Sequence, residues 1–239
     1  MLFSIRNLIQ LVTPITLAYF LSACGHSNNS SSEMEPDVMP PLVMEYQVTL
    51  SNLTNGQPFS PIAVILHGTG EIWQLGQPAS VLLENLAESG DNSGLINADF
   101  VISNASNGDI LLPGSQTQIS ISTTDSAATY LSLATMLVNS NDAFTGLSTI
   151  AINQLEVGDS LSFNAGVYDA GTEGNSEMSG TIPGPADGGE GFNVSRDDVD
   201  YVAMHPGIVS LEDGLNTSVL TYQHRFDNPA MSVKIVRMQ

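Results

Sequence analysis

The sequence predicts an all-β fold, an antiparallel β-sandwich with one short helix, on three observations. Apolar and polar residues alternate with a period of two in several segments, as expected for strands that bury one face. Turn-rich pieces, such as residues 51–56 and 104–109, separate these segments. At 239 residues the chain is long enough for a substantial core, and sandwiches of this size commonly form one domain.

The first 23 residues have the layout of an export signal. A single cation, Arg6, precedes an apolar run from Leu8 to Leu21, and small residues then lead to Cys24. A membrane span is the less favoured interpretation, because polar residues and a proline interrupt the run and no basic stop-transfer cluster follows. Residues 1–23 are therefore predicted to be a lipoprotein signal peptide.

Cys24 is the only cysteine in the chain, so it has no disulfide partner within the molecule. Residues 21–24, LSAC, resemble the bacterial lipobox, in which the cysteine is lipidated and becomes the new N-terminus. Gly25 follows, in place of the Asp that resembles an inner-membrane retention signal. The resemblance implies an exported protein anchored in the outer membrane through Cys24, facing either the periplasm or the cell surface.

Residues 24–44 are rich in Ser, Asn and Pro and contain little that could build a core. They are predicted to form a flexible tether, followed by one domain over residues 45–239.

The predicted strands follow in chain order. Their inward-facing residues are Tyr46, Val48 and Leu50; Ile119 and Ile121 within residues 116–122; Leu161, Phe163, Ala165 and Val167; and alternate positions of residues 231–238. Residues 180–191, rich in Gly and Pro, are predicted to form a surface loop.

The single predicted helix lies within residues 78–90. Ser80 is its candidate N-cap, Leu82, Leu83 and Leu86 form its apolar face, and Gly90 ends it. Such a helix is expected to cover an open end or edge of the sheets.

The charge balance excludes nucleic acid as a partner. The chain has 5 Lys and Arg against 25 Asp and Glu, a net charge of −20, and no Lys or Arg occurs in residues 7–195. A protein that binds a phosphate backbone needs clustered basic groups. Cations are the more plausible small partners, and the alternative is an acidic surface that only keeps an exported protein soluble.

Hydrolase and zinc chemistry have weak support. His67-Gly68-Thr69-Gly70 is similar to an oxyanion-hole loop, but no G-x-S-x-G nucleophile elbow occurs. The segment is therefore predicted to be a strand end followed by a glycine turn. His67, His205 and His224 are widely separated and no H-E-x-x-H is present, so the histidines are predicted to be structural.

A carboxylate-rich turn follows the strand predicted at residues 161–167. Asp169 and Glu173 are four residues apart across a bend that contains glycine, with Asn175 nearby. Calcium takes six to eight oxygen ligands from such side chains, carbonyls and water, although the spacing is not that of an EF-hand. The alternative is a solvated acidic turn.

Four blocks in the chain together resemble the spondin N-terminal domain, particularly its bacterial single-domain form. They are residues 58–61 (PFSP), residues 75–80 with 86–91 (LGQPAS, LAESGD), residues 168–173 (YDAGTE) and residues 224–229 (HRFDNP). The resemblance extends from about Glu45 to the end of the chain. It implies a β-sandwich similar to calcium-dependent lipid-binding domains, with a calcium site at one end and, by analogy with animal relatives, a role in adhesion.

The resemblance also implies the calcium ligands. Asp142 aligns with the first acidic residue of the family site, and Asp169 and Glu173 align with the other two. Ala143 replaces an aromatic residue, Tyr168 replaces a Trp, and Glu173 replaces an Asp. Because Glu reaches one methylene farther and can chelate with both oxygens, a site of altered affinity is expected.

The leading hypothesis is therefore a non-catalytic envelope lipoprotein whose spondin-type domain binds Ca²⁺ and acts in surface binding or adhesion, with an unidentified protein or glycan ligand. The alternatives are a metal-free structural envelope lipoprotein and a secreted hydrolase that uses His67 or His224, for which no nucleophile can be named.

Overall fold

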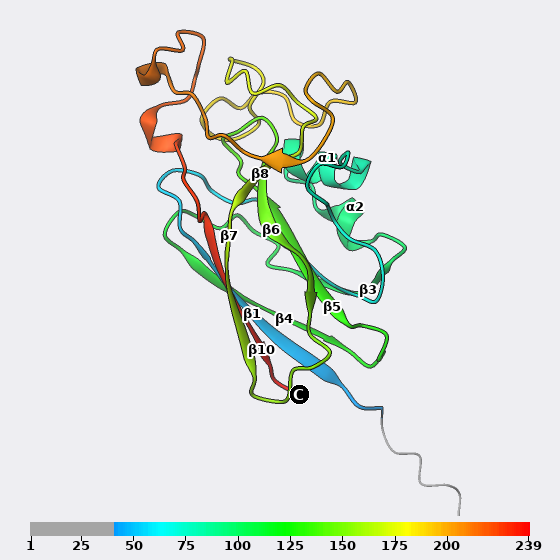
Figure 1. Cartoon of the computed structure of the whole chain (residues 1–239). Helices are drawn as coiled ribbons and strands as arrows, with labels where there is room; N and C mark the ends of the chain where they lie inside the picture. The colour runs from blue at the N-terminus through cyan, green and yellow to red at the C-terminus, as the bar shows by residue number, and fades with distance from the viewer. Residues whose placement is uncertain (1–40) are drawn as a thin grey trace, which may run out of the picture. The chain divides into compact units, whose positions relative to one another are not determined.

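The computed structural model describes residues 41–239 (Figure 1). The predicted signal peptide, Cys24 and residues 24–40 of the predicted tether lie outside the described residues. The elements in chain order are β1 (Met44–Asn52), β2 (Ala63–His67), α1 (Val81–Ser89), α2 (Ser93–Ile96), β3 (Val101–Ser106), β4 (Gln116–Thr123), β5 (Tyr130–Met136), β6 (Ala143–Ala151), β7 (Ser160–Ala165), β8 (Val167–Asp169), β9 (Ala203–Met204), the 3₁₀ turns η1 (Leu211–Asp213) and η2 (Tyr222–His224), and β10 (Met231–Arg237).

The strands form two antiparallel sheets, which confirms the predicted β-sandwich. One sheet has the strand order β4-β1-β10-β7 and the other has the order β3-β2-β5-β6-β8-β9. The main core lies between them, because its buried side chains come from both sheets. At the centre of the smaller sheet, Val48 pairs with Ile119 on one side and Ile235 on the other. The alternation predicted for β1, β4 and β10 is therefore confirmed.

Three predicted boundaries were wrong. Strand β1 begins at Met44, inside the predicted tether, and β3 extends through Asn104–Ser106 into a predicted turn. The predicted strand at residues 161–167 divides at Gly166 into β7, which pairs with β10, and β8, which pairs with β6 of the other sheet. Residues 165 and 167 still point into one core, so the alternation continues although the strand changes sheet.

Strand β2 is buried on both of its faces. Val64 and Leu66 belong to the core between the sheets, whereas Ala63 and Ile65 belong to a second apolar cluster on the outer face of the larger sheet. Helix α1 closes this second cluster with Leu83 and Leu86. The expectation that the helix covers an end or edge of the sheets was therefore wrong, because the doubly apolar strand requires a cover on its outer face.

The helix itself forms as predicted. The hydroxyl of Ser80 accepts a hydrogen bond from the amide of Leu83 at 3.2 Å, and Gly90 ends the helix with φ of 73°. These are the N-cap and C-terminal glycine that stabilise helix ends. The additional helix α2 has only four residues.

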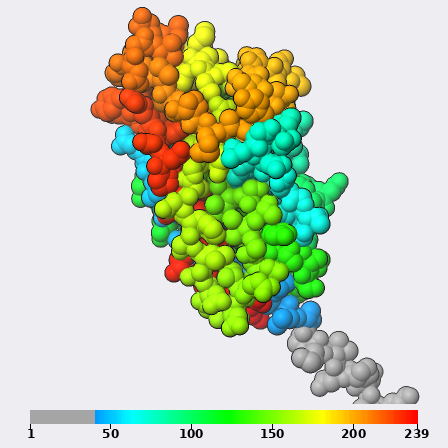
Figure 2. Space-filling model, in the orientation of Figure 1, coloured from blue at the N-terminus to red at the C-terminus, as the bar shows by residue number. Residues whose placement is uncertain are grey.

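Long loops between β8 and β10 gather at one end of the sandwich (Figure 1). In the space-filling view these loops cover that end of the domain, next to α1 (Figure 2). Within these loops, Ile182, Ile208 and Leu220 pack together. The predicted loop at residues 180–191 contains no strand or helix. The chain enters the domain at the opposite end, where the amide of Glu45 donates to the carbonyl of Gln239.

Candidate metal centre

Strand pairing places Asp142 beside Asp169. Asp142 immediately precedes β6 and Asp169 ends β8, and these strands pair with Ala143 opposite Asp169. The exposed fractions of Asp142 and Asp169 are 0% and 4%. Two aspartates that are 27 positions apart in the sequence are thus buried together at the loop end of the larger sheet.

Only one carboxylate oxygen of Asp142 has hydrogen-bond partners. Its Oδ2 accepts from the amides of Thr172 and Glu173 at 2.9 and 3.2 Å, and from the Thr172 hydroxyl at 3.3 Å. Its Oδ1 is buried and has no hydrogen-bond partner. Buried polar atoms without a partner are rare in folded proteins, and an ion or a water molecule is a common reason for one.

The turn after β8 holds Asp169. Its Oδ1 accepts from the amide of Gly171 at 2.7 Å, and its Oδ2 accepts from the side-chain amide of Asn175 at 2.6 Å. The Asn175 oxygen lies 3.0 Å from Nε2 of His205. Because Nδ1 of His205 accepts from the Gly207 amide, the ring proton lies on Nε2 and donates to Asn175.

Glu173 belongs to the same cluster, but its carboxylate is turned toward Asn141. Its backbone amide donates to Asp142, while its Oε1 accepts from the Asn141 side-chain amide at 2.9 Å. The structure therefore brings all three sequence-predicted residues into one loop cluster. Within residues 41–239, no group of three or more Asp, Glu, His or Cys side chains is placed to hold a metal ion by itself. A cation here requires neutral oxygen ligands as well.

The electrostatics of the cluster disfavour bare carboxylates. Burial, followed by the charge of Asp169, raises the pKa of Asp142 to about 7. Burial also raises the pKa of Glu173 to about 7, and every charged group that acts on it is another carboxylate, led by Glu88. Near neutral pH this end of the domain therefore gains stability from a bound proton or a bound cation.

The chemistry of the donors fits calcium. The cluster contains carboxylate oxygens of Asp142, Asp169 and Glu173, and the unpartnered Oδ1 of Asp142 is a ready ligand atom. Calcium prefers such hard oxygen ligands, with backbone carbonyls and water completing the shell.

The sequence motifs did not identify several residues of the cluster. Asn141 and Thr172 are buried and bind the acidic side chains, His205 is buried against Asn175, and the negative charge of Glu88 in α1 contributes to the raised pKa of Glu173. Asn141 adjoins Asp142 and Thr172 adjoins Glu173, so their nearness in sequence was the available signal. No local pattern distinguishes Glu88 from a solvated helix residue.

His67 is enclosed by the fold. His67 ends β2 before a glycine turn, as predicted. Its Nε2 lies 2.8 Å from the Ser132 hydroxyl and its Nδ1 lies 3.0 Å from the Thr69 carbonyl oxygen. Both His67 and Ser132 are 0% exposed, so this serine–histidine pair has no access to a substrate. It gives the hydrolase alternative no support.

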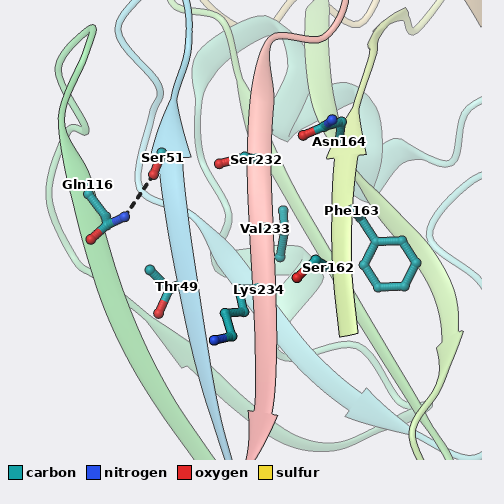
Figure 3. A pocket seen from close by; sticks show the side chains of 9 residues that line it. All are labelled: Thr49, Ser51, Gln116, Ser162, Phe163, Asn164, Ser232, Val233 and Lys234. Carbon is teal, nitrogen blue, oxygen red and sulfur yellow. Dashed lines mark hydrogen bonds between the residues drawn. The ribbon is translucent and has the colours of Figure 1, made fainter. Parts of the chain in front are cut away.

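An open hollow of about 300 Å³ lies on the outer face of the smaller sheet, away from the carboxylates (Figure 3). Thr49, Ser232 and Lys234 come from neighbouring strands β1 and β10, and the remaining lining residues are uncharged. The hollow contains neither a carboxylate nor a histidine, so it has no side chains suited to hold a metal ion.

No protein-family model matches the chain, and a search of curated proteins gives no match. The spondin resemblance therefore depends on the four sequence blocks. Within residues 41–239, no helix is long and apolar enough to cross a membrane.

Proposed function

We propose that this protein is a bacterial envelope lipoprotein whose spondin-type domain binds calcium at its loop end and acts in surface binding or adhesion. The observation that carries the proposal is the buried, unpartnered Oδ1 of Asp142 beside Asp169. The anchor is Cys24, and the chain from it enters the domain at the end opposite to the acidic loops. The chain from the anchor therefore joins the domain at the end that is farthest from the candidate site.

Calcium, when bound, supplies the positive charge that these carboxylates lack. Asp142 offers Oδ1, while the amides of Thr172 and Glu173 hold its Oδ2 in place. Gly171 and Asn175 orient Asp169. These contacts tie the turn at residues 171–175 to β6 and β8, so binding orders the loops that present the surface.

Thermal unfolding of the soluble chain from Gly25 to Gln239, with calcium and with chelator, tests the metal site. A ligand that binds only the folded state raises its apparent stability by mass action. We expect a calcium-dependent rise in Tm that the Asp169→Ala variant loses. Asp99→Asn is the control, because Asp99 is an exposed carboxylate outside the candidate site. Retention of no calcium at millimolar concentration in equilibrium dialysis would refute the site.

The alternative is a structural lipoprotein without metal. It is favoured by the raised pKa of Asp142, about 7, because a protonated carboxyl also relieves the buried charge. It predicts that the wild type has the same Tm in calcium and in chelator, and that the Tm of the Asp169→Ala variant does not depend on calcium either.

The lipid anchor is tested in the full chain. Metabolic labelling with a fatty acid should mark the wild type and leave the Cys24→Ser variant unlabelled and released from membranes.

The adhesive role is tested by the attachment of cells to a surface. Cells that produce the wild type are compared with cells that produce the Asp142→Asn variant, each with calcium and with chelator. Equal attachment in all four cases would contradict it.

A further inference from the structure

The only lysine of the chain lies on the outer face of the smaller sheet. Lys234 belongs to β10 and is exposed. Its neighbours in the strand register are Thr49 of β1 and Ser162 of β7. Within residues 41–239 the ion pairs involve Arg196 and Arg225, and Lys234 takes part in none of them. The ammonium group is therefore free to meet an anion from solution.

Hydroxyl and amide side chains surround this lysine. Strand register places eight outward residues in two adjacent rows, which we call the Lys234 face: Gln118, Thr49, Lys234 and Ser162 in one row, and Gln116, Ser51, Ser232 and Asn164 in the other. These side chains carry one positive charge and no negative charge, although the whole chain has a net charge of −20. The face is thus a local exception to an acidic surface, and an anion is repelled less here.

The Lys234 face is hollowed. All of its residues except Gln118 line the open hollow of about 300 Å³ (Figure 3). The Gln116 side-chain amide donates to the Ser51 hydroxyl at 3.0 Å and joins β4 to β1 at its border. Phe163 also borders the hollow, but its ring points away from Lys234 in Figure 3 and is partly buried against the core. The hollow therefore presents polar groups and one ammonium to a ligand.

This chemistry distinguishes between classes of ligand. A protein partner is normally held by aromatic or aliphatic anchors at the centre of the interface, and every side chain of the Lys234 face is polar. A nucleic acid needs several cations along its backbone, and the face has one. Hydroxyl and side-chain amide groups both donate and accept hydrogen bonds. They complement a ligand that is rich in hydroxyl groups and carries a negative charge within reach of Lys234.

The spacing of the two rows fits a chain of sugar rings. Neighbouring strands lie about 4.8 Å apart, and outward residues repeat about every 6.8 Å along a strand. A pyranose ring with its hydroxyl groups has similar dimensions, so one ring can bond to side chains of two neighbouring strands. A second ring can then occupy the adjacent row.

We propose that the Lys234 face binds an acidic polysaccharide, with the acid group of one sugar unit at the Lys234 ammonium and sugar hydroxyls at Thr49, Ser162 and the neighbouring row. The inference goes beyond the proposed calcium site, because the face contains no carboxylate and lies on the outer side of the smaller sheet, away from the acidic loops. Its binding is therefore independent of calcium.

The single lysine makes a direct test possible. Reductive methylation with isotope-labelled formaldehyde marks Lys234 and the N-terminal amine of the soluble chain from Gly25, and the positive charge is retained. Oligogalacturonate added in chelator is expected to shift the NMR signal of the Lys234 methyl groups. Its methyl ester is the matched neutral ligand and should cause little shift. A sulfated galactan oligosaccharide shows whether a sulfate can replace the carboxylate.

Variants test the same face without labelling. Lys234→Gln removes the charge and keeps an exposed polar side chain, so the fold is expected to persist. The affinity for oligogalacturonate should fall about tenfold or more, because a charge-assisted hydrogen bond is lost. Thr49→Glu should have a similar effect, since the introduced carboxylate lies opposite Lys234 and pairs with it. Arg225→Gln is the control, because Arg225 is an exposed cation outside the face, and its affinity should equal that of the wild type.

A gain of binding completes the test. Gln118→Lys adds a cation opposite Thr49 and should strengthen binding, which a damaged fold cannot do. The proposal would be overturned by an unshifted Lys234 signal with both acidic ligands at millimolar concentration, by equal shifts with the neutral ester, or by equal affinities of the wild type and Lys234→Gln. Asp169→Ala should leave the affinity for the glycan unchanged, so this proposal and the calcium site can fail separately.

Discussion

The backbone amide of Thr172 lies 2.9 Å from Oδ2 of Asp142, although 30 positions separate the two residues in the sequence. Through this bond and that of Glu173, the turn after β8 supplies donors to one oxygen of Asp142 and leaves the other oxygen bare. The backbone therefore stabilises only one of the two carboxylate oxygens of Asp142. The other oxygen needs a bound proton or a bound cation. Proton and calcium concentrations can be varied independently in solution, so the two can be told apart.

In chelator, the Asp142→Asn variant is expected to become increasingly more stable than the wild type as the pH rises from about 4 to about 7. The pKa of Asp142 is raised from 3.8 to about 7 in the folded state. Within this window the folded state keeps a proton that the unfolded state releases, so the wild type loses stability as the pH rises. Each pKa unit corresponds to about 1.4 kcal/mol, and the expected gain is a few kcal/mol. Urea denaturation across this pH range measures it.

Calcium is expected to reverse that order. At neutral pH with saturating calcium the wild type should be more stable than Asp142→Asn, because only the wild type retains the full set of ligands. A difference between the two proteins that changes with neither pH nor calcium would show that Asp142 is an ordinary buried acid.

Gly171→Ala is expected to destabilise the domain and weaken calcium binding. Gly171 has φ of 72°, and an added Cβ would lie 2.3 Å from the carbonyl oxygen of Tyr201. The left-handed conformation alone costs an L-residue roughly 1–2 kcal/mol, and the clash with backbone must displace the turn that holds Asp169. Gly180→Ala is the matched control, with φ of 92° and nothing within 4 Å of the added Cβ. Equal losses in both variants would remove the role assigned to the close approach.

The His205 side chain is expected to remain neutral down to about pH 4. Burial lowers its pKa from 6.5 to about 4. The unfolded state takes up a proton near pH 6.5, so this group contributes stability above that pH and the contribution is lost as the pH falls toward 4. NMR titration of the imidazole nitrogens measures the pKa directly. A midpoint near 6.5 would mean that the ring is not buried as described.

Ser80→Ala is expected to lower the free energy of unfolding by about 1 kcal/mol, because the Leu83 amide loses its cap. Ser80→Asn should retain most of the stability, since Asn is also a good N-cap. Urea denaturation with an unchanged slope would identify a loss of native stability. Equal stability of the Ala variant and the wild type would exclude a role for the cap.

Local sequence patterns predicted the elements that have one buried face and one solvent-exposed face. In β1, β4 and β10 the alternation is direct, because one side of the four-stranded sheet contacts the core and the other contacts solvent. The caps of α1 are local as well. Strand β2 was not identified as a full strand, because burial on both faces replaces alternation with a continuous apolar run. The place of α1 on the outer face follows from that burial and not from the helix sequence.

The candidate site divides in the same way. The sequence by itself determined that an acidic turn of oxygen donors follows residue 168, and a family resemblance was needed to add Asp142. Only the tertiary structure decided that Asp142 lies beside Asp169 and that Glu173 turns toward Asn141. These contacts join segments far apart in the chain. Strand register determines them, and a local residue pattern does not contain it.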